Sequence, residues 1–173
     1  MKVINLFAGP GAGKSTIAAG LFYYMKTKDY KVELVTEYAK QLVYDDRINA
    51  LLDQLYVFSK QLRKLRQLEN KVDYVITDSP ILLSNYFGKN YSHYFSKQLE
   101  DLVLHEFANF DNINLFIERT KKYQAYGRLG SEESAKHADK EILQILNDNL
   151  LTYFKIKGDW PLEKIFKLIS IYT

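Results

Sequence analysis

Residues 8–16 read Ala8-Gly9-Pro10-Gly11-Ala12-Gly13-Lys14-Ser15-Thr16. The stretch matches the phosphate-loop pattern G-x-x-x-x-G-K-[ST] at every fixed position except the first, where Ala8 replaces glycine. Glycines let the backbone turn tightly, so that successive N–H groups point inward and surround phosphate oxygens. A glycine-rich turn without a ligand is the alternative, but it would not need the lysine and the hydroxyl that follow. The stretch therefore predicts nucleotide binding.

Two side chains of this loop have specific expected roles. In phosphate loops the lysine reaches the β- and γ-phosphates and the neighbouring hydroxyl binds Mg²⁺, which assigns these roles to Lys14 and Ser15. We predict that ATP is bound by Gly9, Pro10, Gly11, Ala12, Gly13, Lys14, Ser15 and Thr16. A phosphate loop indicates nucleotide binding but no particular reaction, because switch proteins, motor ATPases and small-molecule kinases all have one.

Strand and helix patterns alternate on both sides of the loop. Apolar runs predict strands at 2–7, 31–35, 72–77, 113–117 and 153–156. Apolar periodicity and capping residues predict helices at 14–26, from Glu37 after a Thr36 cap, at 48–70, 92–110 and 131–150, and from Pro161. This alternation predicts an α/β fold of the P-loop nucleotide-kinase type, with a five-stranded, mostly parallel sheet flanked by helices. The sequence contains no linker or repeat, so we expect one kinase domain over residues 1–173.

Two carboxylates follow predicted strands. Asp78 comes directly after the strand at 72–77, and Glu37 comes two residues after the strand at 31–35. Ligands of parallel α/β sheets bind at the carboxyl ends of the strands, so both carboxylates should face the phosphate loop. Phosphoryl transfer needs one group to hold Mg²⁺ and another to orient or deprotonate the attacking hydroxyl. We expect Glu37 and Asp78 to share these tasks, with Asp78 and Ser15 as the candidate metal ligands. The alternatives are a turn-capping Asp78 and a first-turn Glu37 favoured by the helix dipole.

Residues 119–130 form a basic segment between the fourth predicted strand and the next helix. The segment contains no acidic residue, and its cations are Arg119, Lys121, Lys122 and Arg128. A cationic loop in this place, punctuated by glycines, is typical of a lid that closes over a triphosphate. Arg119 and Arg128 are the stronger candidates for phosphate contacts, because a guanidinium grips phosphate bidentately. A solvated surface loop is the alternative.

Composition excludes several classes of protein. The 173 residues include no cysteine, which excludes a disulfide scaffold, a thiolate metal site and a cysteine nucleophile. The net charge of +3 suits phosphate-bearing partners but does not by itself indicate nucleic-acid binding. No apolar run approaches the roughly 18 residues of a membrane span, and the N-terminus lacks a secretory cleavage site. We therefore expect a cytoplasmic protein without a membrane partner.

Taken together, these motifs resemble the ribosylnicotinamide-kinase domain of bacterial NAD-salvage proteins and its relatives among small phage-encoded kinases. The likeness covers essentially the whole chain and rests on the phosphate loop, Thr36-Glu37-Tyr38-Ala39-Lys40, Asp78, and Tyr126-Gly127-Arg128-Leu129-Gly130. It implies transfer of the γ-phosphate of ATP, with Mg²⁺, to a hydroxyl of a nucleoside-like acceptor. By position, Glu37 and Asp78 would serve the acceptor and the metal, and Arg119 and Arg128 the lid. Some phage kinases of this group are thought to phosphorylate 5-hydroxymethyluracil within DNA.

Two stretches would suit an acceptor within DNA. Residues 60–71 carry five cations against one acid, Glu69, and residues 86–95 interleave five aromatic side chains with Lys89 and His93. Cations beside aromatic rings could stack an extruded base and hold its backbone. The alternative is a solvated helix face and an aromatic core.

Two other functions remain compatible with the sequence. A P-loop ATPase switch acting through a partner would use the apolar stripe from Leu51 to Leu65 as an interface. A nucleoside monophosphate kinase would need an extra cationic clamp, for which Arg47 and Arg63 are candidates. Arg47 follows Asp45 and Asp46, and these three residues could border an acceptor pocket, although a solvated helix end is the favoured interpretation. The sequence leaves the acceptor and the oligomeric state open.

Overall fold

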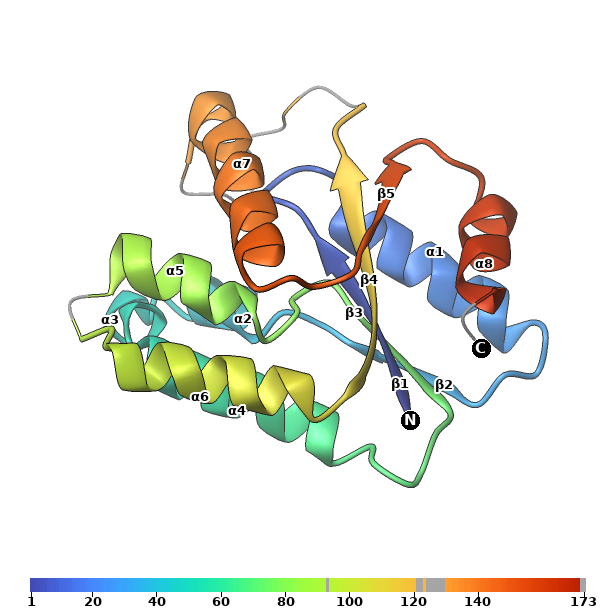
Figure 1. Ribbon diagram of the computed structural model, residues 1–173, viewed down its shortest axis with the longest axis horizontal. Helices are drawn as coiled ribbons and strands as arrows, with labels where there is room; N and C mark the ends of the chain where they lie inside the picture. The colour runs from blue at the N-terminus through green and yellow to red at the C-terminus, as the bar shows by residue number, and fades with distance from the viewer. Residues whose placement is uncertain (93, 121–122, 124–129, 172–173) are drawn as a thin grey trace.

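The computed structural model describes residues 1–173 apart from 93, 121–122, 124–129 and 172–173. Its centre is a five-stranded sheet in the order β2-β3-β1-β4-β5, in which all neighbouring strands are parallel (Figure 1). The strands are β1 (Lys2–Phe7), β2 (Val32–Val35), β3 (Tyr74–Thr77), β4 (Asp111–Glu118) and β5 (Phe154–Lys157). The predicted α/β fold is confirmed, and the sheet is wholly rather than mostly parallel.

Helices cover both faces of this sheet. One face carries α1 (Lys14–Lys26) and α8 (Leu162–Ser170), and the other carries α4 (Gln54–Arg66), α5 (Leu83–Tyr91), α6 (Lys97–Ala108) and α7 (Glu132–Asp148) (Figure 1). The short helices α2 (Tyr38–Tyr44) and α3 (Ile48–Leu52) lie in the chain between β2 and α4.

Strand β1 contributes to a hydrophobic core on each side of the sheet. Val3 and Phe7 pack with residues of α4, α5, α6 and α7, whereas Ile4 and Leu6 pack with residues of α1 and α8. Alternate side chains of a strand point to opposite faces, so a strand covered on both faces needs apolar residues at nearly every position. This is why the strand at 2–7 is an almost continuous apolar run.

Asn5 is the polar interruption of that run, and its side chain is satisfied by the neighbouring strand. Its Nδ2 donates hydrogen bonds to Asn112 Oδ1 at 2.8 Å and to Asn114 Oδ1 at 3.1 Å, both in β4. A buried amide without such partners would be costly. The interruption therefore links β1 to β4 without breaking the sheet.

The single helix predicted at 48–70 is wrong, because the chain forms two helices, α3 and α4, with a break at Asp53. Asp53 has φ −81° and ψ 89°, and its side chain accepts a hydrogen bond from the Tyr56 N–H at 3.0 Å. An aspartate that caps the following turn competes with continuation of the preceding helix. The second helix also ends at Arg66 rather than at Asn70, which has a positive φ of 59°.

Two further helix boundaries differ from the prediction. The helix predicted at 92–110 begins only at Lys97, after Ser96, whose Oγ accepts a hydrogen bond from the Leu99 N–H at 3.3 Å. Helix α5 was not predicted, because its aromatic stretch carried no clear start signal. Thr36 does not cap α2, since Glu37 is the residue that precedes the helix and the helix begins at Tyr38.

Of the helices that the structure describes, none is both long enough and apolar enough to cross a membrane.

Candidate active site

The phosphate loop connects β1 to α1 and takes a conformation that needs its glycines. Gly11 and Gly13 have φ of +80° and +99°, in the left-handed region that residues with a side chain rarely adopt. Gly13 directly precedes α1, so the N-terminal N–H groups of the helix are presented at the loop. Ala8, which replaces the first glycine of the pattern, does not have a positive φ, and its methyl group is therefore tolerated.

The Lys14 side chain folds back over the loop. Its Nζ donates hydrogen bonds to the backbone oxygens of Ala8 at 2.7 Å and Gly9 at 3.1 Å. Burial lowers the pKa of this ammonium group, while the carboxylates of Glu37 and Asp78 raise it. The ammonium group is thus held at the loop by two neutral carbonyl oxygens. A phosphate oxygen can take their place, because its hydrogen bond to the ammonium group is charge-assisted and stronger.

Asp78 joins the phosphate loop to the end of β2. Val35 of β2 is the register partner of Thr77 of β3, so the residues that follow these strands lie next to one another. Asp78 Oδ2 accepts a hydrogen bond of 2.5 Å from Ser15 Oγ, and Oδ1 accepts one of 3.1 Å from the Glu37 N–H. The Asp78 side chain is buried. The structure thus brings Ser15, Asp78 and Glu37 together at the carboxyl edge of the sheet.

Glu37 is the second carboxylate of this edge and has a different environment. Burial raises its pKa, the ammonium group of Lys14 lowers it, and the negative charge of Asp78 raises it again. A carboxylate whose pKa is raised accepts a proton more readily than a free one. Glu37 is therefore chemically suited to take a proton from a hydroxyl bound beside the loop.

The Ser15 and Asp78 oxygens are donors of the kind that Mg²⁺ prefers. Within the described ranges no group of three or more His, Cys, Asp or Glu residues is arranged to hold a metal ion. Mg²⁺ is usually held by one or two carboxylates together with substrate phosphates and water, and a larger protein cage is not required. The hydroxyl and carboxylate present here fit that type of site.

Arg119 and the phosphate loop both bind Asp139, a residue of α7. The Asp139 carboxylate pairs with Arg119 Nε and accepts a 3.2 Å hydrogen bond from Arg119 Nη2. Its Oδ1 also accepts a hydrogen bond of 2.6 Å from the Gly9 N–H. The side chains of Arg119 and Asp139 are only 13% and 16% exposed. Arg119 is therefore fixed beside the loop rather than free in solvent.

The sequence matches a known family over most of its length. Residues 3–162 fit the family described as AAA domain. The chain belongs to this AAA domain family. No curated protein matches the sequence.

Solved structures resemble this AAA domain in fold at low sequence identity. Two are structures of deoxyadenosine kinase from M. mycoides. The one with bound dATP is 22% identical, with a TM-score of 0.56 over 99% of this chain and 98% of that one. The one with dCMP and dCDP is 19% identical, with a TM-score of 0.57 over 99% of this chain and 97% of that one. Shikimate kinase from Aquifex aeolicus is 16% identical, with a TM-score of 0.54 over 99% and 95%. These likenesses establish a nucleotide-kinase-like fold for the AAA domain.

The remaining predicted residues are placed unequally. Arg128, together with Lys121, Lys122 and most of the predicted lid, lies outside the described residues, and its phosphate contact stays a prediction. Tyr86 is buried in the core formed with α4, α6 and α7, whereas Tyr94 is 89% exposed.

The sequence motifs do not single out Asp139. The sequence does offer one indication: Asp139 lies one turn after Ala135, beside the buried face of α7.

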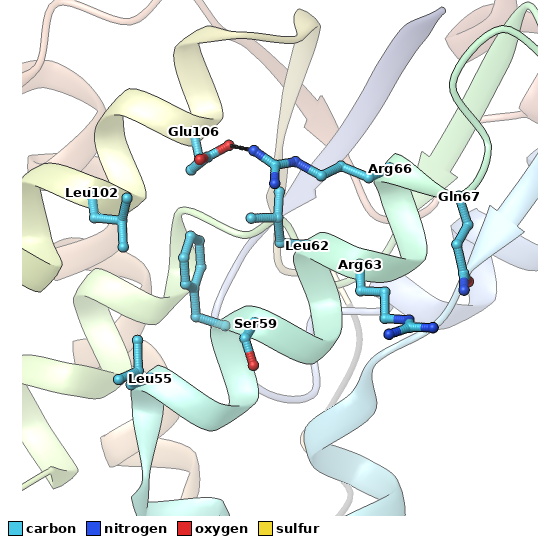
Figure 2. Close-up of a pocket in the computed structure, with 9 residues that line it drawn as sticks. Leu55, Ser59, Leu62, Arg63, Arg66, Gln67, Leu102 and Glu106 are labelled. Atoms are coloured by element: carbon cyan, nitrogen blue, oxygen red, sulfur yellow. Dashed lines mark hydrogen bonds and ion pairs between the residues drawn. The ribbon is translucent and has the colours of Figure 1, made fainter.

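The predicted apolar stripe between Leu51 and Leu65 is mostly core. Phe58, Leu62 and Leu65 are buried, but Leu55 is 55% exposed. Leu55 opens into a groove of about 550 Å³ between α4 and α6, which Figure 2 shows with the Arg66–Glu106 ion pair across it. No phosphate-loop residue lines this groove, so it is separate from the candidate active site.

Proposed function

We propose that this AAA domain is an ATP-dependent phosphotransferase that moves the γ-phosphate of ATP to a hydroxyl of a nucleoside-type acceptor. The observation that carries the proposal is the meeting of two unlike carboxylates beside one phosphate loop. Asp78 accepts hydrogen bonds from the Ser15 hydroxyl and the Glu37 N–H, and burial raises the pKa of the Glu37 carboxyl group. A simple nucleotide switch needs the first carboxylate but has less use for the second, whereas a kinase needs both.

The division of labour follows from these contacts. The loop N–H groups bind the ATP phosphates, and Lys14 leaves its carbonyl partners to bind the β- and γ-phosphates. Ser15 and Asp78 would hold Mg²⁺, which neutralises charge on the phosphates when bound. Glu37 takes the proton of the acceptor hydroxyl, whose oxygen bonds to the γ-phosphorus as the bond to the ADP oxygen breaks. Arg119 keeps its place beside the loop through Asp139, and we propose that its guanidinium contacts the phosphates from there.

A nucleoside-type acceptor is supported by two lines of argument. The motif resemblance set out above points to a primary alcohol on a nucleoside, either nicotinamide riboside or 5-hydroxymethyluracil in DNA. The fold is similar to that of a deoxyadenosine kinase over nearly the whole of both chains. We further propose that residues 1–173 act as one domain, because both hydrophobic cores are built on the same sheet.

Transfer of label from γ-labelled ATP tests the proposal. The acceptors are a nucleoside panel that includes nicotinamide riboside, and DNA that carries 5-hydroxymethyluracil. Label on an acceptor is the expected result, and Lys14→Ala should abolish it while circular dichroism stays unchanged. The matched control is Lys28→Ala, which changes a lysine outside the site. Release of phosphate with no labelled acceptor would instead favour an ATPase switch, and normal transfer by Lys14→Ala would overturn the assigned role of the loop.

A further inference from the structure

A cluster of cations and tyrosines lies on α4, the start of α2 and the α2–α3 connection, next to Glu37. We define the cation–tyrosine cluster as Tyr38, Tyr56, Arg47, Lys60 and Lys64. The two tyrosine hydroxyls are hydrogen-bonded to each other at 2.7 Å, and their rings meet edge to face with centroids 5.8 Å apart. Lys60 Nζ lies 5.2 Å from the centre of the Tyr56 ring, and Lys64 Nζ lies 5.5 Å from the centre of the Tyr38 ring.

The cluster is attached to the strand end that carries the two carboxylates. Lys64 Nζ donates a hydrogen bond of 3.1 Å to the backbone oxygen of Thr36, the residue before Glu37. The Tyr38 N–H donates one of 3.1 Å to Gln61 Oε1. Burial lowers the pKa of Lys64, and the negative charge of Asp78 opposes this effect. A ligand whose hydroxyl reached Glu37 would therefore have the cluster beside it.

The three cations of the cluster have no acidic partner. Among the residues that the structure describes, no carboxylate lies within ion-pair distance of Arg47, Lys60 or Lys64. Some other lysines do pair with acids, as in Lys26–Glu33 and Lys136–Glu132.

The positive charges of the cluster act on Tyr56. The hydrogen bond between the two tyrosine hydroxyls lowers the pKa of Tyr56, and the positive charges of Lys60 and Arg47 lower it further. The hydrogen bond with Tyr56 and, more weakly, the negative charge of Asp45 raise the pKa of Tyr38.

We infer that this cluster binds phosphate of the acceptor, so that the acceptor is a nucleotide rather than a neutral nucleoside. The inference rests on the proposed function, because it places the acceptor hydroxyl at Glu37. Cations without an acidic partner beside half-buried tyrosine rings are a combination that suits a nucleotide: the cations bind phosphate oxygens, and an aromatic ring can stack on the base. A free nucleotide and a nucleotide within a single strand share this chemistry.

Equilibrium binding of two probes tests the inference. The first probe is a fluorescein-labelled single-stranded dT12 oligonucleotide, and the second is dTMP compared with thymidine. The wild-type chain should bind at least one phosphate-bearing probe, and dTMP should bind about tenfold more tightly than thymidine if the free nucleotide is the source. The double variant Arg47→Gln/Lys60→Gln should lose about tenfold in affinity, and for the oligonucleotide its salt slope should fall by about 1.4, since each cation contributes about 0.7.

A matched variant separates the cluster from a general effect of charge. Lys28 also lies over a tyrosine ring, with Nζ 5.0 Å from the centre of the Tyr24 ring, but it is far along the chain from the cluster and close to α1. Lys28→Gln should leave both affinities unchanged. Both cluster residues that are replaced are exposed, so an unchanged melting temperature is expected and confirms folding. Binding of neither phosphate-bearing probe, or equal binding by the double variant and the wild type, would overturn the inference.

Failure of the inference and failure of the proposed function are distinguishable. Lys14→Ala removes the ATP site and should leave oligonucleotide or dTMP binding intact. Phosphoryl transfer to neutral nucleosides without any preference for a phosphate-bearing acceptor would overturn the cluster's role and leave the kinase. Phosphate-dependent binding without phosphoryl transfer to any acceptor would support the phosphate-binding role of the cluster and overturn the proposed kinase activity.

Discussion

The N–H of Gly9 donates a hydrogen bond of 2.6 Å to Oδ1 of Asp139, and this contact ties the start of the phosphate loop to helix α7. The same carboxylate pairs with Arg119 at the end of β4. One side chain of α7 therefore determines the position of the loop and of the arginine next to it.

Replacement of Asp139 by alanine should weaken both the fold and nucleotide binding. The change leaves the Arg119 guanidinium and the Gly9 N–H without their carboxylate partner. Breaking a largely buried ion pair from one side costs about 3–5 kcal/mol, and the residual exposure here favours the lower end, about 3 kcal/mol. Urea unfolding measures the loss. Asp139→Asn should lose less, because its amide oxygen still accepts the Gly9 hydrogen bond. The control is Asp148→Asn on the exposed end of the same helix, and equal losses in the two asparagine variants would contradict the role of Asp139.

A side chain at Gly9 should push the loop away from α7. A β-carbon built on Gly9 would lie 2.5 Å from the Ala135 backbone oxygen and 2.9 Å from Ala138 Cβ. A helix backbone cannot give way cheaply, so we expect Gly9→Ala to lower the melting temperature and weaken ATP binding. Gly13→Ala is the comparison, because no atom lies within 4 Å there and only the positive φ of 99° opposes the change. Its cost should be about 1–2 kcal/mol from backbone strain alone. A melting temperature for Gly9→Ala equal to the wild type would show that the contact yields easily.

Replacing Asp78 and replacing Glu37 should change different kinetic parameters. Asp78→Asn leaves an oxygen for the Ser15 hydroxyl but removes the negative charge beside it, and should therefore raise the Mg²⁺ concentration needed for half-maximal rate. Glu37→Gln keeps the backbone hydrogen bond to Asp78 and should lower kcat by about 10²–10⁴-fold with little change in ATP affinity. Titrations of rate against Mg²⁺ and ATP for both variants provide the test. The same response in both variants would show that the roles are not divided as proposed.

The sequence predicts the parts of this site that depend on local patterns and on one rule of topology. The helix at 14–26 and the loop before it follow from a motif whose residue types are required by its backbone shape. The meeting of Glu37 and Asp78 follows because parallel strands place their carboxyl ends at one edge. Neither inference needs knowledge of how the helices pack.

Other features depend on contacts that a sequence pattern does not show. Asp139 lies in a helix rich in exposed charges, and only the packing of α7 on the loop distinguishes it from Glu133 or Lys140. The break at Asp53 results from a side-chain cap that competes with an otherwise continuous apolar periodicity. The cation–tyrosine cluster requires α2 and α4 to lie side by side, although Tyr38 and Tyr56 are 18 residues apart in the chain.

The raised pKa of Glu37 predicts a pH dependence of stability with a definite sign. Burial is the main cause, so the folded chain binds the Glu37 proton more tightly than the unfolded chain, whose value is near 4.5. Stability from this group is therefore fully present below pH 4.5 and is lost as the pH rises through the folded pKa. Glu37→Gln cannot ionise, so its free energy of unfolding relative to the wild type should increase as the pH rises above 4.5. Urea unfolding at several pH values measures this difference, with the exposed Glu133→Gln as control. A difference that stays constant with pH would show that Glu37 has an ordinary pKa, and would remove the basis for its assignment as the base.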